Sequence, residues 1–309
     1  MMTTEKNYLT IQKQYTPYKW YKPLLVTLAA FGCFMVFSLV ISIVSSVIAL
    51  NQGYDLEKLL SGGYDTLDAY SPLGAFMSLG GVAVGIPALI LGNLMVHARP
   101  FSSYSSSRGG FRFGIFAKCM VAALIVVALP LVLLAVFFNE GNGMIKFSVF
   151  GFILCTILAP LQCVAEEYVF RGHLMQMFGA WIKFPFIPII LQTVFFAMAH
   201  PYNVVGVITI SVMGLVLGIC AYVTNGLEAS CALHITNNMV AYYLVGFGMG
   251  STKTEVAVTD VISTVAVCCI YLAFIIFADK KLGWFHKSKK DDVAAFNEKL
   301  AARRQTNTQ

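Results

Sequence analysis

The chain has 309 residues, of which 58% are hydrophobic and only 12% are charged, and its formal net charge is +6. A soluble chain is about a quarter charged, so this sequence has too few polar side chains to cover the outside of a water-soluble fold. The composition also excludes a disordered chain, a collagen, a coiled coil and a small disulfide scaffold. Together with a mean hydropathy of +0.75, it predicts an all-α integral membrane protein, a polytopic helical bundle.

Eight apolar segments are candidates for transmembrane helices, which need about 20 apolar residues each. They cover residues 23–50, 71–97, 113–138, 146–172, 184–200, 202–225, 227–247 and 256–278. The first is too long for the apolar region of a cleaved signal peptide, so we expect it to remain as a membrane anchor. The fifth is short for a span, and the fourth ends in charged residues.

These segments divide the chain into five parts and leave no separate soluble domain. The expected parts are a cytosolic tail at 1–22, three N-terminal spans within 23–138, a core at 146–250, a last span at 256–278 and a basic cytosolic tail at 279–309. Basic residues mark the cytosolic side of a membrane protein. With the N-terminus inside, only Lys58, Lys146 and Lys253 would lie outside among the lysines and arginines. This distribution predicts that both termini are cytosolic.

Two further features are expected to carry little chemistry. The serine-rich segment 102–110 is typical of a flexible loop on the inner side. The eight cysteines lie within apolar runs and show neither a CxxC motif nor a Cys/His metal spacing. We therefore expect them to be small apolar side chains inside helices.

Charged residues end the fourth apolar segment, although each costs about 2.5–3.5 kcal/mol inside a membrane on insertion scales. Glu167 and Arg171 are spaced to pair on one helical face, which leaves the adjacent Glu166 without a local partner. Two neighbouring carboxylates in a low dielectric cannot both ionise cheaply, so such a pair can divide into a structural and a proton-transfer role. The alternative is an ordinary charged helix end at the cytosolic surface.

Two histidines and an asparagine interrupt later apolar segments. Glu166 precedes Lys183 by as many residues as His200 follows it, so an antiparallel hairpin turning near Lys183 would bring both to one level, about 25 Å from the turn. His200 is otherwise a satisfied helix cap. His234 and Asn238 share one helical face, as either an interhelical hydrogen-bonding pair or a donor pair for an oxyanion.

Other catalytic patterns are absent from the sequence. It contains no HExxH zinc motif, no G-x-S-x-G elbow and no Walker loop. Asp65 follows a tyrosine in an outer connection, but no second aspartate motif occurs in a later segment. Glu228 and Asp260 begin apolar segments, where an interfacial position is expected. The residues left for chemistry are two glutamates, two histidines and an asparagine on three segments.

Three motifs follow one another on successive apolar segments: Glu166-Glu167-x-x-x-Arg171, Phe196-x-x-x-His200 and His234-x-x-x-Asn238. In this order and at these separations, residues 146–245 resemble the CPBP (Abi) family of intramembrane proteases, which includes type II CAAX prenyl proteases and bacteriocin-processing members. The resemblance implies a helical bundle with a polar cavity open to the cytosol and hydrolysis of a peptide bond. It assigns water activation to Glu166 assisted by His200, oxyanion stabilisation to His234 and Asn238, and the architecture of the site to Glu167 and Arg171.

The resemblance leaves the cofactor open. The family is often described as metalloproteases, and Glu166, His200 and His234 are candidate ligands for a divalent ion, with Zn²⁺ the default for such a mixed set. A glutamate–histidine pair can also activate water unaided, and the spacing does not decide between the two.

The resemblance also implies partners and a location. The expected partners are a peptide or protein-tail substrate, prenylated or bacteriocin-like, and the lipid bilayer, with no nucleic acid. The expected location is a bacterial plasma membrane. Two other functions stay open on the sequence: a non-catalytic scaffold for bacteriocin immunity or partner binding, and a proton-coupled transporter, because intramembrane Glu and His also form proton relays.

Overall fold

The computed structural model describes residues 7–285, apart from 16, 56, 58–67, 109, 139–140, 142 and 251–257, and it describes the backbone alone for 258–260. Several features discussed above lie outside the described residues: Lys58, Asp65, Lys253, the Asp260 side chain and the tail from residue 286 onward.

Every regular element in the described part of the chain is helical, which confirms the predicted all-α class. The elements are η1 Ile11–Gln14, α1 Lys22–Asn51, α3 Pro72–Ala83, α4 Gly85–Val96, α5 Ser102–Ser105, α6 Phe113–Ala123, η3 Leu124–Ala128, α7 Leu129–Phe137, α8 Val149–Glu167, η4 Tyr168–Met175, α9 Gln176–Trp181, α10 Phe186–Met198, α11 Val204–Thr224, α12 Glu228–Gly246 and α13 Val258–Leu282. Of these, η1 is a 3₁₀ turn, whereas η3 and η4 are π-helical. The π segments continue the helices before and after them.

Six helices of the described chain are long and apolar enough to cross a membrane. They are Lys22–Asn51, Pro72–Val96, Phe113–Phe137, Val149–Trp181, Val204–Thr224 and Val261–Leu282. The fifth and seventh predicted segments form helices too, but α10 is short and α12 contains Glu228, His234 and two asparagines. The predicted number of eight spans, the orientation and the domain boundaries therefore stay predictions.

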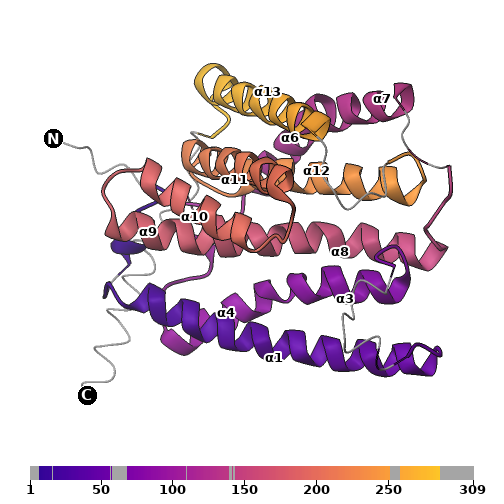
Figure 1. Cartoon of the computed structure of the whole chain (residues 1–309). Coiled ribbons are helices and arrows are strands. Elements are labelled where there is room, and N and C mark those ends of the chain that lie inside the picture. Colours follow the sequence, from indigo (N-terminus) through magenta and orange to yellow (C-terminus); the bar gives the residue numbers. More distant parts are fainter. Residues whose placement is uncertain are drawn as a thin grey trace.

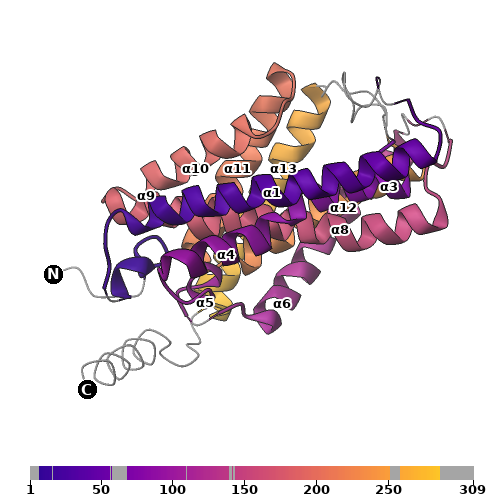
Figure 2. The same cartoon turned by 90° about the horizontal axis from the view of Figure 1, so that it is seen from below.

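The helices pack side by side in an order that places α8 at the centre (Figure 1). On one side of α8, α3 packs against it and α4 packs against α1; on the other, α12 contacts both α8 and α6, and α11 contacts α13. Figure 2 shows the beginning of α1, α5 and α9 gathered at one end of the bundle. The last turn of α8 is surrounded by protein, since Cys163, Ala165, Glu166 and Glu167 are all buried.

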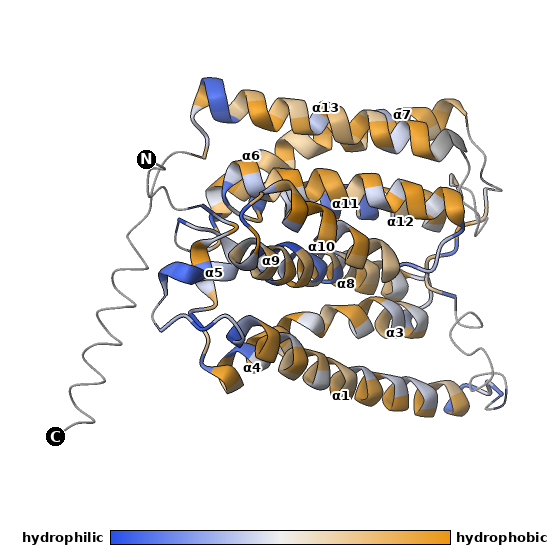
Figure 3. Ribbon diagram, turned by 60° about the vertical axis from the view of Figure 1, so that its left-hand side comes forward, coloured by the Kyte–Doolittle hydropathy of each residue, from blue (hydrophilic) through white to orange (hydrophobic). Residues whose placement is uncertain are grey.

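The outer helices turn apolar side chains away from the bundle. Hydrophobic residues dominate along α7, α11 and α13 (Figure 3), and only 6% of the most apolar window of α1 is buried. Leu28, Phe31 and Leu39 on α1 are each about 60% exposed. A surface of this kind is stable only in contact with lipid, so the molecule is an integral membrane protein.

The turn between α11 and α12 is fixed by local chemistry. Asn225 adopts a left-handed conformation (φ 55°) that ends α11, as asparagine can at a helix C-terminus. A Cβ on the next residue, Gly226, would come within 2.4 Å of Glu228 and 2.6 Å of Arg112, so only glycine fits there. Glu228 is fully buried, and its carboxylate accepts hydrogen bonds from the Arg112 guanidinium at 2.9 and 2.6 Å. Glu228 thus has a structural partner in Arg112, and its expected interfacial position stays a prediction.

The serine-rich segment expected to be a flexible loop is instead packed into the protein. Ser103, Tyr104 and Ser105 are almost completely buried, and α5 forms part of the segment. Ser106 pairs with Gly226 in an isolated antiparallel bridge. The loop composition was misleading because the turn after α11 supplies backbone partners that a sequence pattern cannot reveal.

Candidate active site

The EExxxR motif lies where α8 changes into a π-helix. Glu166 and Glu167 are the last two residues of α8, and Arg171 lies within η4. Helix α8, η4 and α9 run as one helix over Val149–Trp181. Short π segments inside α-helices often occur at functional sites, and this one begins directly after the two glutamates.

Glu167 and Arg171 form the ion pair that their spacing predicts. The Arg171 Nη1 lies 3.0 Å from Glu167 Oε1, and neither side chain is exposed. Arg171 Nη2 donates to the Gly214 carbonyl at 3.2 Å, and the guanidinium lies 4.2 Å from the centroid of the Phe196 ring. These contacts tie η4 to α10 and α11, so the pair holds three helices in register.

His234 lies between the two glutamates. Its Nδ1 is 2.8 Å from Glu167 Oε1, and its Nε2 is 3.5 Å from Glu166 Oε2. Because Arg171 holds Glu167 as a carboxylate, the imidazole Nδ1–H donates to it, which fixes the ring and turns Nε2 toward Glu166. The neighbouring carboxylates thus have different partners, as the predicted structural role of one and proton-transfer role of the other require.

Glu166 keeps one oxygen free. Gln162 Nε2 donates to Glu166 Oε1 at 2.5 Å, whereas Oε2 is buried and has no hydrogen-bond partner among the described residues. Glu166 as a whole is only 8% exposed. A held carboxylate with one open acceptor is the arrangement that a general base needs. Gln162 was not singled out from the sequence, although its position one helical turn before Glu166 is a usable signal.

His200 reaches the cluster through an aromatic ring. It follows the end of α10, and its Nδ1 lies 2.7 Å from the Phe196 carbonyl oxygen. The Phe196 ring centroid is 4.6 Å from that of His200 and 5.9 Å from that of His234. No ion pair joins His200 to Glu166 in the described part of the chain. The histidine is therefore separated from His234 by the Phe196 ring, and no hydrogen bond of its Nε2 is found among the described residues.

Asn238 lies one turn after His234 on α12 and is half-buried. Its neighbour in space is Cys163, whose thiol also approaches Gln162 Oε1 (3.5 Å) and the His234 carbonyl (3.8 Å). The asparagine is thus at the edge of the cluster, and one thiol separates it from the residue that holds Glu166. Cys163 is a second member of the site that the motifs did not reveal.

The predicted metal ligands do not assemble into a metal site. Within the described residues, no group of three or more His, Cys, Asp and Glu side chains is placed to hold a metal ion. Glu166 and His234 face each other, but His200 does not complete a set of three with them. The chemistry argued below therefore uses only the protein's own side chains and water.

The fold and the cluster define a helical membrane protein with a carboxylate–imidazole site on its central helix. Residues 147–240 match the family model "Type II CAAX prenyl endopeptidase Rce1-like", and all the predicted site residues fall within this range. This part of the chain thus resembles an Rce1-like domain, and the predicted resemblance to CPBP proteases is confirmed. No curated protein and no solved structure matches the chain.

Proposed function

We propose that the protein is an intramembrane endopeptidase that hydrolyses a peptide bond with water activated by Glu166. The observation that carries the proposal is the Glu166 carboxylate inside the Rce1-like domain, with Oε1 held by Gln162 and Oε2 unpaired opposite His234 Nε2. A buried acceptor without a hydrogen-bond partner costs folding free energy, so its presence requires an explanation such as a catalytic role.

The proposed reaction begins with a water between Glu166 and the substrate. Glu166 Oε2 takes a proton from this water, and the water oxygen bonds to the carbonyl carbon of the substrate. His200 Nε2 orients the same water. When the tetrahedral intermediate collapses, the C–N bond breaks and the proton on Glu166 passes to the leaving amine. Such proton transfer contributes about 10²–10⁴-fold in rate.

The developing oxyanion needs donors. With Nδ1–H bonded to Glu167, His234 Nε2 donates to the oxyanion only when this nitrogen carries a proton, whereas the Asn238 amide is always a donor. One oxyanion donor contributes about 10²–10³-fold. Glu167 and Arg171 act at a distance from the substrate by holding the His234 ring in place.

The proposed substrate is a peptide or protein tail that enters from the cytosolic side of a bacterial plasma membrane. A prenylated tail and a bacteriocin-like peptide are both compatible with the family that the domain resembles. Comparing the membrane proteomes of cells that express wild type or Glu166→Gln would identify the tail that is cleaved. The peptide found in this way then serves as the substrate for purified protein.

The test of the site uses matched pairs of variants on that peptide. Glu166→Gln and His200→Asn are each expected to lower kcat by at least about 10²-fold. Glu57→Gln changes an exposed glutamate and His97→Asn an exposed histidine, also at a helix end, and both should leave kcat unchanged. Cleavage at the wild-type rate by purified Glu166→Gln would refute the protease. Bacteriocin protection that survives in the same variant would favour the scaffold instead.

A further inference from the structure

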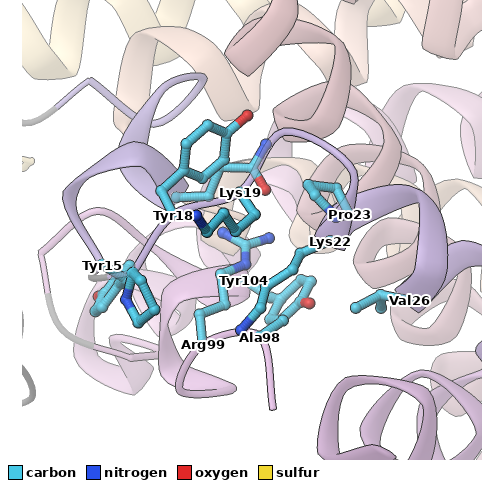
Figure 4. A pocket seen from close by; sticks show the side chains of 11 residues that line it. Tyr15, Tyr18, Lys19, Lys22, Pro23, Val26, Ala98, Arg99 and Tyr104 are labelled. Atoms are coloured by element: carbon cyan, nitrogen blue, oxygen red, sulfur yellow. The ribbon is translucent and has the colours of Figure 1, made fainter. Parts of the chain in front are cut away.

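A pocket lies at the end of the bundle where α1 begins, and it shares no residue with the candidate active site (Figure 4). Its empty volume is about 290 Å³, which includes space open to the surroundings. The segment before α1, the first turns of α1 and the connection after α4 line it. Among the described residues, the lining contains three cationic side chains, those of Lys19, Lys22 and Arg99, and no carboxylate.

Arg99 is a buried charge with only neutral partners. It is 6% exposed, and its guanidinium carbon lies 3.8 Å from the centroid of the Tyr104 ring. It donates to the Gly172 carbonyl at 3.3 Å and to the Gln176 side-chain oxygen. No ion pair with a carboxylate is found for it among the described residues. Buried charges are normally compensated by an opposite charge, so Arg99 favours an anionic ligand in this pocket.

Two lysines add to the same field. Lys19 and Lys22 line the pocket together with Arg99 (Figure 4). Lys22 Nζ donates to the His97 carbonyl at 3.0 Å, which holds its charge at the pocket. Like charges around one pocket repel one another, and an anion between them would offset this repulsion.

Exposed aromatic residues next in sequence to the two lysines are typical of the level of lipid headgroups. Trp20 and Tyr21, next to the two lysines, are 65% and 43% exposed, and Trp181 Nε1 donates to the Trp20 carbonyl at 3.0 Å. Exposed tryptophan and tyrosine mark the boundary between the hydrocarbon core and water. The apolar, lipid-facing length of α1 starts directly after them.

We propose that this pocket binds a phosphate group, that of an anionic lipid headgroup, between Lys19, Lys22 and Arg99. Basic pockets between helices at a membrane surface are suited to such headgroups. The site is independent of the protease chemistry, because it uses none of its residues. The pocket is connected to η4, because Arg99 donates a hydrogen bond to the carbonyl of Gly172, the residue after Arg171.

The test compares two charge-matched double variants of the full chain in detergent. Lys19→Gln/Lys22→Gln removes the two pocket lysines, and Lys13→Gln/Lys183→Gln removes two exposed lysines that do not line it. Native mass spectrometry measures the retention of phosphatidylglycerol and phosphatidylcholine. Each basic residue near an anionic surface contributes about a factor of five, so the pocket pair should weaken phosphatidylglycerol binding about 30-fold. The control pair should weaken it less than about threefold.

Inorganic phosphate distinguishes the source of the ligand. If phosphatidylglycerol stays bound in millimolar phosphate, the ligand of the pocket is the lipid headgroup. If phosphate displaces the lipid, the ligand is a soluble phosphate compound. Either result supports a phosphate site if it depends on Lys19 and Lys22. The proposal is overturned if both double variants lose lipid equally, or if wild type retains both lipids equally. Circular dichroism and gel filtration confirm that each variant is folded.

Discussion

The Glu167–Arg171 pair allows a quantitative test of how the site is held together. Both side chains are fully buried at a separation of 3.0 Å, and removing one partner of such a pair costs about 3–5 kcal/mol because the other charge is left alone. Arg171→Met also loses the bond to the Gly214 carbonyl and the contact with Phe196, so we expect a value near 5 kcal/mol. Native proteins are stable by only about 5–15 kcal/mol.

The double variant Glu167→Gln/Arg171→Met should recover much of that loss. No unpaired charge remains in it, and the new amide oxygen can still accept from His234 Nδ1. Replacing both partners of a buried pair is often nearly neutral, so we expect the double variant to cost about 1–2 kcal/mol. The coupling between the two sites would then be at least about 2 kcal/mol.

The assay is equilibrium unfolding in mixed micelles, followed by circular dichroism, with Lys183→Met as the control for loss of an exposed cation. An Arg171→Met variant no less stable than Lys183→Met would refute the reasoning. So would a double variant whose cost equals the sum of the two single costs, because the pair would then contribute nothing as a pair.

Two further predictions concern single contacts. Gln162→Leu removes the hydrogen bond to Glu166, which as a bond to a charged group is worth about 1.5–3 kcal/mol; kcat on the cleaved peptide should fall about 10- to 100-fold with KM unchanged. Thr156→Val, which removes a hydrogen bond to Tyr243 elsewhere on α8, should leave kcat within about twofold, and an equal fall in both variants would contradict a positioning role. Gly226→Ala should destabilise the fold by about 1–3 kcal/mol in the unfolding assay because of overpacking, whereas Gly81→Ala meets nothing within 4 Å and should be neutral; equal stability of the two would show that the turn tolerates a side chain.

Local spacing was sufficient to predict the contacts within one helix. The separation of Glu167 and Arg171 predicted their ion pair, although part of the intervening helix is π-helical. Apolar length likewise predicted the positions of the long helices, because both signals depend on residues that are close in sequence.

Contacts between helices could not be derived in this way. His234 inserts between two carboxylates on α8, and this depends on how α12 rotates and packs, which no local pattern specifies. The burial of the serine-rich segment has the same origin, since its partners Asn225 and Gly226 come from a distant turn. Apolar length also predicted a span over residues 227–247, although α12 is not among the six candidate spans of the described chain. Several of its polar residues are buried inside the protein.

The different surroundings of Glu166 and Glu167 explain why one motif can serve two purposes. Arg171 and His234 occupy Glu167 Oε1, and this ion pair gives the carboxylate a structural role, although its Oε2, like that of Glu166, has no hydrogen-bond partner among the described residues. Glu166 is one residue further back, which on a helix turns it toward Gln162 and leaves Oε2 open. A mutation that gave Glu166 a fixed cationic partner would keep the Glu166 carboxylate charged but would occupy its open oxygen. The proposed chemistry therefore depends on the asymmetry between the two glutamates rather than on their presence alone.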